Sequence, residues 1–154
     1  MTHASTIHRW LQEEKHFLGC FKSSKLPKFP SSFPKSLIIN IDEDANIGHF
    51  VALLLQDTYV IYFDPLGLRP PLNENIKYYL KSVYLNVRFY SCLFPLQHDF
   101  SVKCGEFCSI FILRVKNVNN FKTYINIFHK SNLWRNDVIV DFLFNMTHCP
   151  PLLK

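Results

Sequence analysis

The chain has 154 residues, 48% of them hydrophobic and 16% aromatic, which is enough to build the core of one domain without disulfides or metal. Its formal net charge of +5 fits contact with a polyanion such as nucleic acid, and fits equally well a role in keeping an aromatic-rich protein soluble. No apolar run approaches the roughly 18 residues of a membrane span and the N-terminus lacks a secretory signal, so we expect an intracellular protein without membrane contact.

The first half of the chain is predicted to contain one helix and three strands. Apolar residues at spacings of three and four predict a short amphipathic helix over residues 6–16. Three prolines among lysines and serines then predict an irregular, basic surface segment over residues 19–36. Apolar runs at 36–41, 49–56 and 59–64 follow, and the last two form a β-hairpin that we expect to be buried on both faces.

The second half is predicted to be mainly helical. Asn73 is placed to cap a helix, and a β-branched and aromatic run over 86–94 predicts a further strand. Helices are predicted over residues 74–84, 104–115, 121–128 and 133–144. The helix over 104–115 is apolar nearly all round, so we expect it to be buried. This order predicts an α+β fold in which a small, mostly antiparallel sheet packs against helices, in one domain over residues 1–154.

The cysteines indicate thiol chemistry better than a disulfide scaffold or a metal site. Their number is odd and their positions are scattered, and no second pair matches the spacing of Cys104 and Cys108, so we expect reduced thiols and no zinc. A nucleophilic cysteine needs a helix N-terminus or a histidine to stabilise its thiolate. Cys104 begins a predicted helix, whereas Cys108 lies one turn inside it and fits a small buried side chain. Taken alone, Cys104 also fits the core.

His49 and Asp64 are candidates for the partners of this cysteine. His49 starts one strand of the predicted hairpin and Asp64 ends the other, so antiparallel pairing brings them to the same end. A carboxylate beside an imidazole fixes the orientation of the ring, as in a catalytic triad. Separately, Asp64 before Pro65 also fits a turn, and His49 also fits a core histidine whose ring nitrogens are bonded.

Gln97 is a candidate for the fourth role. Acyl transfer to a thiolate builds negative charge on an oxygen, and a glutamine amide together with the backbone N–H of Cys104 would stabilise it. A solvated loop glutamine is the alternative. His98, Asp99 and Glu106 show no role in the sequence, and we expect them on the surface.

Together these stretches resemble a known family, the adenovirus endopeptidase adenain and its relatives in other DNA viruses and virus-like transposons, which are related to the SUMO and ubiquitin-like proteases. The resemblance lies in "GHFVALLL", "YFDPLG" and "QHDFSVKCGEFC", in this order and with the glutamine seven positions before the cysteine. "HFLGCF" is similar to an N-terminal stretch of the family. The likeness covers about residues 16–115 and leaves a helical C-terminal part over 116–154.

The resemblance implies a cysteine-protease fold of the adenain type, with the nucleophile at the N-terminus of a buried helix. It implies Cys104 as nucleophile, His49 as general base and acid, Asp64 as the group that orients His49, and Gln97 in the oxyanion hole. The implied substrates are viral capsid and core precursors, cut at glycine-containing sites during virion maturation. By the same resemblance we expect a monomer in the host nucleus or the virion that requires no cofactor, with DNA or a short peptide as activators.

Two departures from the family limit this transfer. His49 is followed by Phe50 where the family usually has tryptophan, and no cysteine matches the one that adenain links to its activating peptide. Two alternatives stay open at the level of the sequence. One is an isopeptidase that removes ubiquitin or SUMO-like modifiers, and the other is a non-catalytic, basic nucleic-acid-binding relative.

Overall fold

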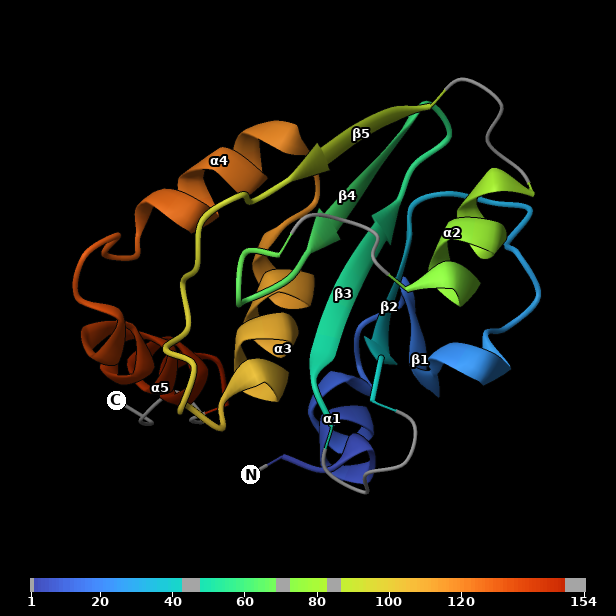
Figure 1. The fold of residues 1–154 in the computed structure, drawn as a ribbon. Coiled ribbons are helices and arrows are strands. Elements are labelled where there is room, and N and C mark those ends of the chain that lie inside the picture. Colours follow the sequence, from blue (N-terminus) through green and yellow to red (C-terminus); the bar gives the residue numbers. More distant parts are fainter. Residues whose placement is uncertain (1, 43–47, 69–72, 83–86, 149–154) are drawn as a thin grey trace, which may run out of the picture.

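The computed structural model describes residues 2–42, 48–68, 73–82 and 87–148, which form a five-stranded sheet flanked by helices (Figure 1). The strands, in sheet order, are β1 (Phe17–Lys22), β2 (Lys35–Asn40), β3 (Phe50–Leu55), β4 (Tyr59–Phe63) and β5 (Arg88–Ser91). The helices are α1 (Ala4–Leu11), the 3-10 turn η1 (Ser23–Lys25), α2 (Glu74–Lys81), α3 (Cys104–Arg114), α4 (Val118–Asn126) and α5 (Leu133–His148).

The sheet is antiparallel at its centre and parallel at both edges. β3 pairs antiparallel with β2 and with β4, whereas β1 pairs parallel with β2 and β5 pairs parallel with β4. The expected α+β fold and the β3–β4 hairpin are confirmed. The parallel edges arise because the chain crosses over before it re-enters the sheet, through η1 and the following loop on one side and through α2 on the other.

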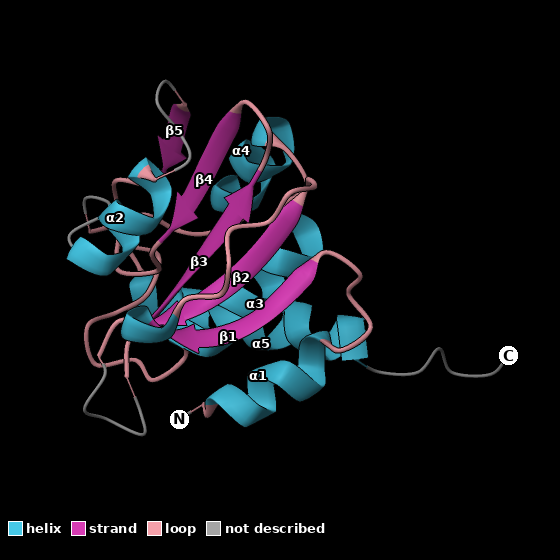
Figure 2. Ribbon diagram, turned by 90° about the vertical axis from the view of Figure 1, so that its right-hand side faces the viewer, coloured by secondary structure: helices cyan, strands magenta, loops and turns pink. Residues whose placement is uncertain are grey.

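Two cores sandwich the sheet, as the hydrophobicity of its central strands predicts. Side chains alternate along β3, so Ala52 and Leu54 face the core of α3, while Val51, Leu53 and Leu55 face the core of α2. Every residue of β3 is buried, which confirms burial on both faces of the hairpin. Figure 2 shows the two layers, with α1, α3, α4 and α5 on one side of the sheet and α2 on the other.

The helix α3 is the central element of the larger core. Phe111 on α3 stacks on Phe63 of β4, with ring centroids 4.9 Å apart and an interplanar angle of 7°. The thiols of Cys104 and Cys108 lie against the carbonyl oxygens of Gly48 and Phe50, so α3 runs alongside β3 in the same direction. The N-terminus of the buried helix is therefore fixed beside the residues that precede β3.

The prediction of an irregular segment over residues 19–36 was wrong in part. Residues 17–22 form the edge strand β1, and the irregular path begins only at the prolines that follow η1. The strand forms because its pairing partner, β2, lies in the same sheet beyond the loop, and Gly19 adopts a φ of 139° at a shift in the register. Within the described ranges, no helix is both long enough and apolar enough to cross a bilayer.

Candidate active site

His49 and Asp64 meet at one end of the β3–β4 hairpin. His49 directly precedes β3 and Asp64 directly follows β4, so the antiparallel register places them side by side. The imidazole Nε2 donates a hydrogen bond of 2.7 Å to Oδ1 of Asp64, and the backbone N–H of Leu66 donates one of 2.8 Å to the same oxygen. Because an ionised carboxylate only accepts hydrogen bonds, this contact assigns the proton to Nε2 and leaves Nδ1 for proton exchange.

The surroundings of His49 favour its protonated form. Burial by itself lowers the pKa of the imidazole, but the hydrogen bond to Asp64, the interaction with Cys104 and the charges of these two groups raise the pKa of His49 to about 9. The ring is therefore protonated at neutral pH. An imidazolium in this position stabilises a neighbouring thiolate.

The titration of His49 is expected to depend on Asp64. The substitution Asp64→Asn keeps the shape of the side chain but removes its charge, so the pKa of His49 should fall from about 9 toward its ordinary value of 6.5. An NMR titration of the His49 ring protons measures this directly. The native ring should lose its proton as the pH rises through about 9, and the ring in Asp64→Asn at a lower pH. Identical curves would show that the carboxylate does not control the charge of His49.

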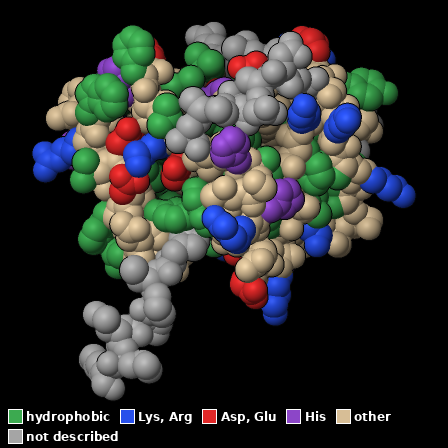
Figure 3. Space-filling view, turned by 90° about the horizontal axis from the view of Figure 1, so that it is seen from below, with side chains coloured by type: hydrophobic (Ala, Val, Ile, Leu, Met, Phe, Trp, Pro, Cys, Tyr) green, Lys and Arg blue, Asp and Glu red, His purple; other side chains and the backbone are tan. Residues whose placement is uncertain are grey.

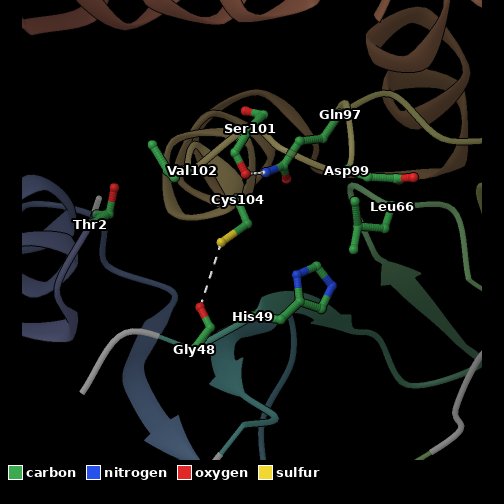
Figure 4. Close-up of a pocket in the computed structure, with 9 residues that line it drawn as sticks. All are labelled: Thr2, Gly48, His49, Leu66, Gln97, Asp99, Ser101, Val102 and Cys104. Carbon is green, nitrogen blue, oxygen red and sulfur yellow. Dashed lines mark hydrogen bonds between the residues drawn. The ribbon is translucent and has the colours of Figure 1, made fainter. Parts of the chain in front are cut away.

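Cys104 is the first residue of α3, and its thiol lies beside this pair. The residue is 9% exposed, and its Sγ lies 3.7 Å from the carbonyl oxygen of Gly48. Figure 4 shows the sulfur directed from α3 toward the carbonyl oxygen of Gly48, with the imidazole of His49 to one side. The first backbone N–H groups of a helix have no partner inside the helix, and their dipoles favour an anion at this point. The position suits a thiolate.

The other described cysteines lie in environments that keep their thiols protonated. Cys108 is fully buried, donates to the carbonyl oxygen of Phe50 at 3.4 Å, and has a pKa raised well above its ordinary value by burial. Burial also raises the pKa of Cys92, and burial with the charge of Cys104 raises the pKa of Cys20 to about 12. The geometry therefore favours Cys104 over Cys108 as the reactive sulfur.

Gln97 is buried, with its amide directed to the segment that leads into α3. It is 2% exposed, and its Nε2 donates to the carbonyl oxygen of Ser101 at 2.8 Å. This contact sets the orientation of the amide, because the reverse orientation would place two oxygens against each other. An amide nitrogen carries two hydrogens, so the second one remains to stabilise an anionic oxygen. The alternative interpretation, that Gln97 is a solvated loop residue, is therefore wrong.

The turn after β4 connects the positions of Asp64 and Gln97. The carbonyl oxygen of Pro65 accepts hydrogen bonds from the backbone N–H groups of Leu96 and Gln97, at 2.8 and 2.9 Å. Asp64, one residue earlier, holds His49. This turn therefore positions both the imidazole of His49 and the amide of Gln97 at the same cavity.

Gly67 makes this turn possible, and we predict that Gly67→Ala destabilises the fold. Its φ is 66°, and a Cβ at this position would lie 2.3 Å from the backbone carbonyl carbon of Phe94. The free energy of unfolding should fall by about 2–4 kcal/mol, because both the backbone conformation and the packing exclude a side chain. Urea unfolding followed by circular dichroism measures the loss. Leu68→Ala, at a 45% exposed neighbour, is the control and should change the free energy by less than about 0.5 kcal/mol.

These side chains surround a cavity of about 220 Å³. In Figure 4, Cys104 and His49 occupy its middle, with Thr2 and Val102 on one side and Leu66 and Asp99 on the other. The lining residues are Thr2, Gly48, His49, Leu66, Gln97, Asp99, Ser101, Val102 and Cys104. Asp64 lies behind His49 and affects the cavity through its hydrogen bond to the imidazole.

Several of these residues were not predicted to belong to a site. Asp99 was expected on the surface without a role, and it is exposed but lines the cavity. Thr2 is 5% exposed, and its hydroxyl donates to Glu106 Oε2 at 2.6 Å. A Cβ at Gly105 would lie 2.8 Å from the side chain of Thr2, so this packing requires the glycine. No spacing in the sequence signals that Thr2 reaches the first turn of α3.

The site offers nucleophilic chemistry and does not resemble a metal centre. Among the residues that the structure describes, no group of three His, Cys, Asp or Glu side chains is arranged to hold a metal ion. The groups that line the cavity include one thiol, one imidazole with the carboxylate of Asp64 behind it, and one amide. This set fits attack of a thiolate on a carbonyl group.

The fold is similar to that of a viral protease. The crystal structure of the ASFV pS273R protease aligns with 92% of this chain at a TM-score of 0.56 and 17% identity, and a selenomethionine structure of the same protease aligns with 96% at 0.52 and 16%. This chain spans 63% and 66% of the length of those two chains. No family model matches the sequence. No curated protein matches it either. At these identities the likeness establishes the fold.

Proposed function

We propose that this protein is a cysteine endopeptidase that cleaves viral or virus-like precursor proteins at glycine-containing sites. The observation that carries the proposal is the convergence of Cys104, Gln97 and the His49–Asp64 pair on one cavity. The viral protease fold supports it. The preference for glycine comes from the resemblance of the sequence to the adenain family.

The first half of the reaction forms a thioester. The Cys104 thiolate attacks the carbonyl carbon of the scissile peptide bond, and the new S–C bond leaves negative charge on the carbonyl oxygen. The free amide hydrogen of Gln97 and the backbone N–H of Cys104 stabilise this oxygen. The imidazolium of His49 transfers its Nδ1 proton to the leaving nitrogen, the C–N bond breaks, and the amine product departs.

The second half returns the enzyme to its starting state. A water molecule gives a proton to the neutral Nδ1 of His49 and attacks the thioester carbon. The tetrahedral oxygen again lies against Gln97 and the first turn of α3. Breakage of the C–S bond releases the carboxylic acid and restores the thiolate–imidazolium pair. Asp64 holds the ring in one orientation through both halves, because its hydrogen bond to Nε2 persists.

A peptide-library digest tests the proposal. The purified chain is incubated with peptides that contain glycine at varied positions, and mass spectrometry identifies the new termini. We expect cleavage on the carboxyl side of glycine, and no cleavage after treatment with iodoacetamide. A covalent adduct with a ubiquitin or SUMO vinyl sulfone, without cleavage of linear peptides, would instead indicate a deconjugating isopeptidase. If the chain gives neither cleavage nor adduct but binds DNA, the non-catalytic alternative is correct.

A further inference from the structure

The segment formed by residues 96–103 carries Gln97 and leads into the first turn of α3. It has no regular secondary structure, and one turn is closed by a hydrogen bond of 2.8 Å from the N–H of Ser101 to the carbonyl oxygen of His98. Figure 1 shows the segment in yellow, running past α5 before it enters α3. Such a segment needs external contacts to hold an amide within the few tenths of an ångström that oxyanion stabilisation requires.

Asn136 of α5 provides one such contact before Gln97. Its side chain is completely buried, and its Nδ2 donates to the carbonyl oxygens of Leu96 and His129, both at 2.8 Å. Its Oδ1 accepts from the backbone N–H of His129 at 2.7 Å. All three bonds connect the side chain to backbone. Since the carbonyl of Leu96 belongs to the peptide bond that precedes Gln97, Asn136 restrains the start of the segment directly.

Asp137, the next residue of α5, provides a second contact after Gln97. Its Oδ1 accepts a hydrogen bond of 2.9 Å from the hydroxyl of Ser101, and that hydroxyl accepts one of 3.3 Å from the backbone N–H of Lys103. The carbonyl oxygen of Ser101 is also the partner of the Gln97 amide. A chain of hydrogen bonds therefore runs from Asp137 through Ser101 to Gln97 and to the residue before Cys104.

A third contact is an ion pair of Lys103 with Asp141, one turn further along α5. The side chain of Asp141 is 48% exposed, and ion pairs that are accessible to solvent contribute little to stability. Figure 3 shows acidic and basic side chains next to one another on the side of the molecule where α5 lies. We therefore assign the restraint of the segment to the two hydrogen-bonded contacts.

We propose that Asn136 and Asp137 are positioning residues that hold Gln97 in the oxyanion hole, so that α5 is part of the catalytic apparatus. This inference rests on the proposed function. Neither residue lines the cavity, and each acts through the backbone of Leu96 or through Ser101. Their loss should weaken stabilisation of the tetrahedral oxygen and leave the reactivity of the Cys104 thiolate largely unchanged, because the imidazole of His49 beside it is held by Asp64 and not by α5.

Three reactions of the full chain separate these effects. Hydrolysis of a fluorogenic glycine amide gives kcat and KM. Binding of a peptide aldehyde that ends in glycinal forms a tetrahedral oxygen and so reports on the oxyanion hole. Alkylation by iodoacetamide displaces iodide, forms no such oxygen, and reports on the thiolate alone. The variants are Asn136→Ala, Asp137→Ala and Asp137→Asn. Val140→Ala is the matched control, since Val140 is fully buried on the same helix and belongs to the core.

In Asn136→Ala and Asp137→Ala we expect kcat and aldehyde affinity to fall roughly 10- to 100-fold, with KM and the alkylation rate changed by less than about 3-fold. Asp137→Asn keeps an oxygen that accepts from Ser101 and should restore most of the loss. Val140→Ala should lower the midpoint of urea unfolding with little effect on kcat. Gln97→Ala removes the amide itself, so its losses of kcat and of aldehyde affinity set the upper limit for the α5 variants.

The outcomes distinguish this inference from the proposed function. If the native chain neither hydrolyses the substrate nor binds the aldehyde, the proposed function fails, and this inference falls with it. If the native chain is active but both alanine variants keep kcat and aldehyde affinity, or lose them only as far as Val140→Ala does, α5 has a purely structural role. Should Asn136→Ala not fold, the comparison of Asp137→Ala with Asp137→Asn decides alone, because Asp137 is only half-buried.

Discussion

Replacement of Cys104 by alanine should reduce peptide hydrolysis by a factor on the order of 10⁴ or more, because no other group in the cavity can form the thioester. The fold should be preserved, since the residue packs at the edge of the cavity, where its thiol lies 3.7 Å from the carbonyl oxygen of Gly48 and interacts with the imidazole of His49. Initial rates with the fluorogenic glycine amide measure the loss. Urea unfolding of the same sample shows whether the variant is folded.

Cys108→Ala is the matched control for this prediction. The residue lies one turn further along the same helix and is fully buried, so its replacement should cost about 1–2 kcal/mol of stability. Its kcat should stay within about 3-fold of the native value, because its thiol points at the carbonyl of Phe50 inside the core. Loss of hydrolysis in Cys108→Ala, with full activity in Cys104→Ala, would assign the nucleophile to the other sulfur.

The second large effect is expected from His49→Ala. Removal of the imidazole takes away both the cation that stabilises the thiolate and the acid that protonates the leaving nitrogen, so kcat should fall by a factor on the order of 10³–10⁴. Asp64 is then left buried without its partner, so stability should also decrease. The measurement is a full rate-against-substrate curve at neutral pH.

The control for this experiment is His129→Ala, because His129 is exposed and its hydrogen bonds to Asn136 of α5 are made by its backbone. Its kcat should equal that of the native chain within about 2-fold. An active His49→Ala variant would mean that the imidazole has a structural role at the start of β3. The carboxylate of Asp64 would then be a turn residue, held by the N–H of Leu66.

The parts of the fold that follow from local pattern were predictable. The uninterrupted apolar runs of β3 and β4 predict strands buried on both faces, and the short connection of three residues between them predicts a hairpin. Because hairpin pairing is local, the sequence also indicates that His49 and Asp64 meet. The all-round apolarity of α3 predicts that it is buried, and so places Cys104 at the start of a central helix.

The parts that depend on distant segments were not predictable. β1 contains a glycine and is stabilised by parallel pairing to β2, which no local pattern encodes. The contribution of Thr2 to the cavity depends on how α1 packs against α3. Likewise, Asn136 is one polar residue in a helix, and the positioning role that we propose for it rests on three bonds to backbone in other segments, which no local pattern indicates.

The most direct test of the central claim is the rate of Cys104 alkylation by iodoacetamide as a function of pH, in the native chain and in His49→Ala. If His49 and Cys104 form an ion pair, the native thiol should still react rapidly at pH 6–7, and His49→Ala should react at least about 10-fold more slowly there. The two profiles should converge above pH 9, where the imidazole of His49 is neutral. Profiles that coincide over the whole range, with slow reaction at neutral pH in both chains, would contradict the account.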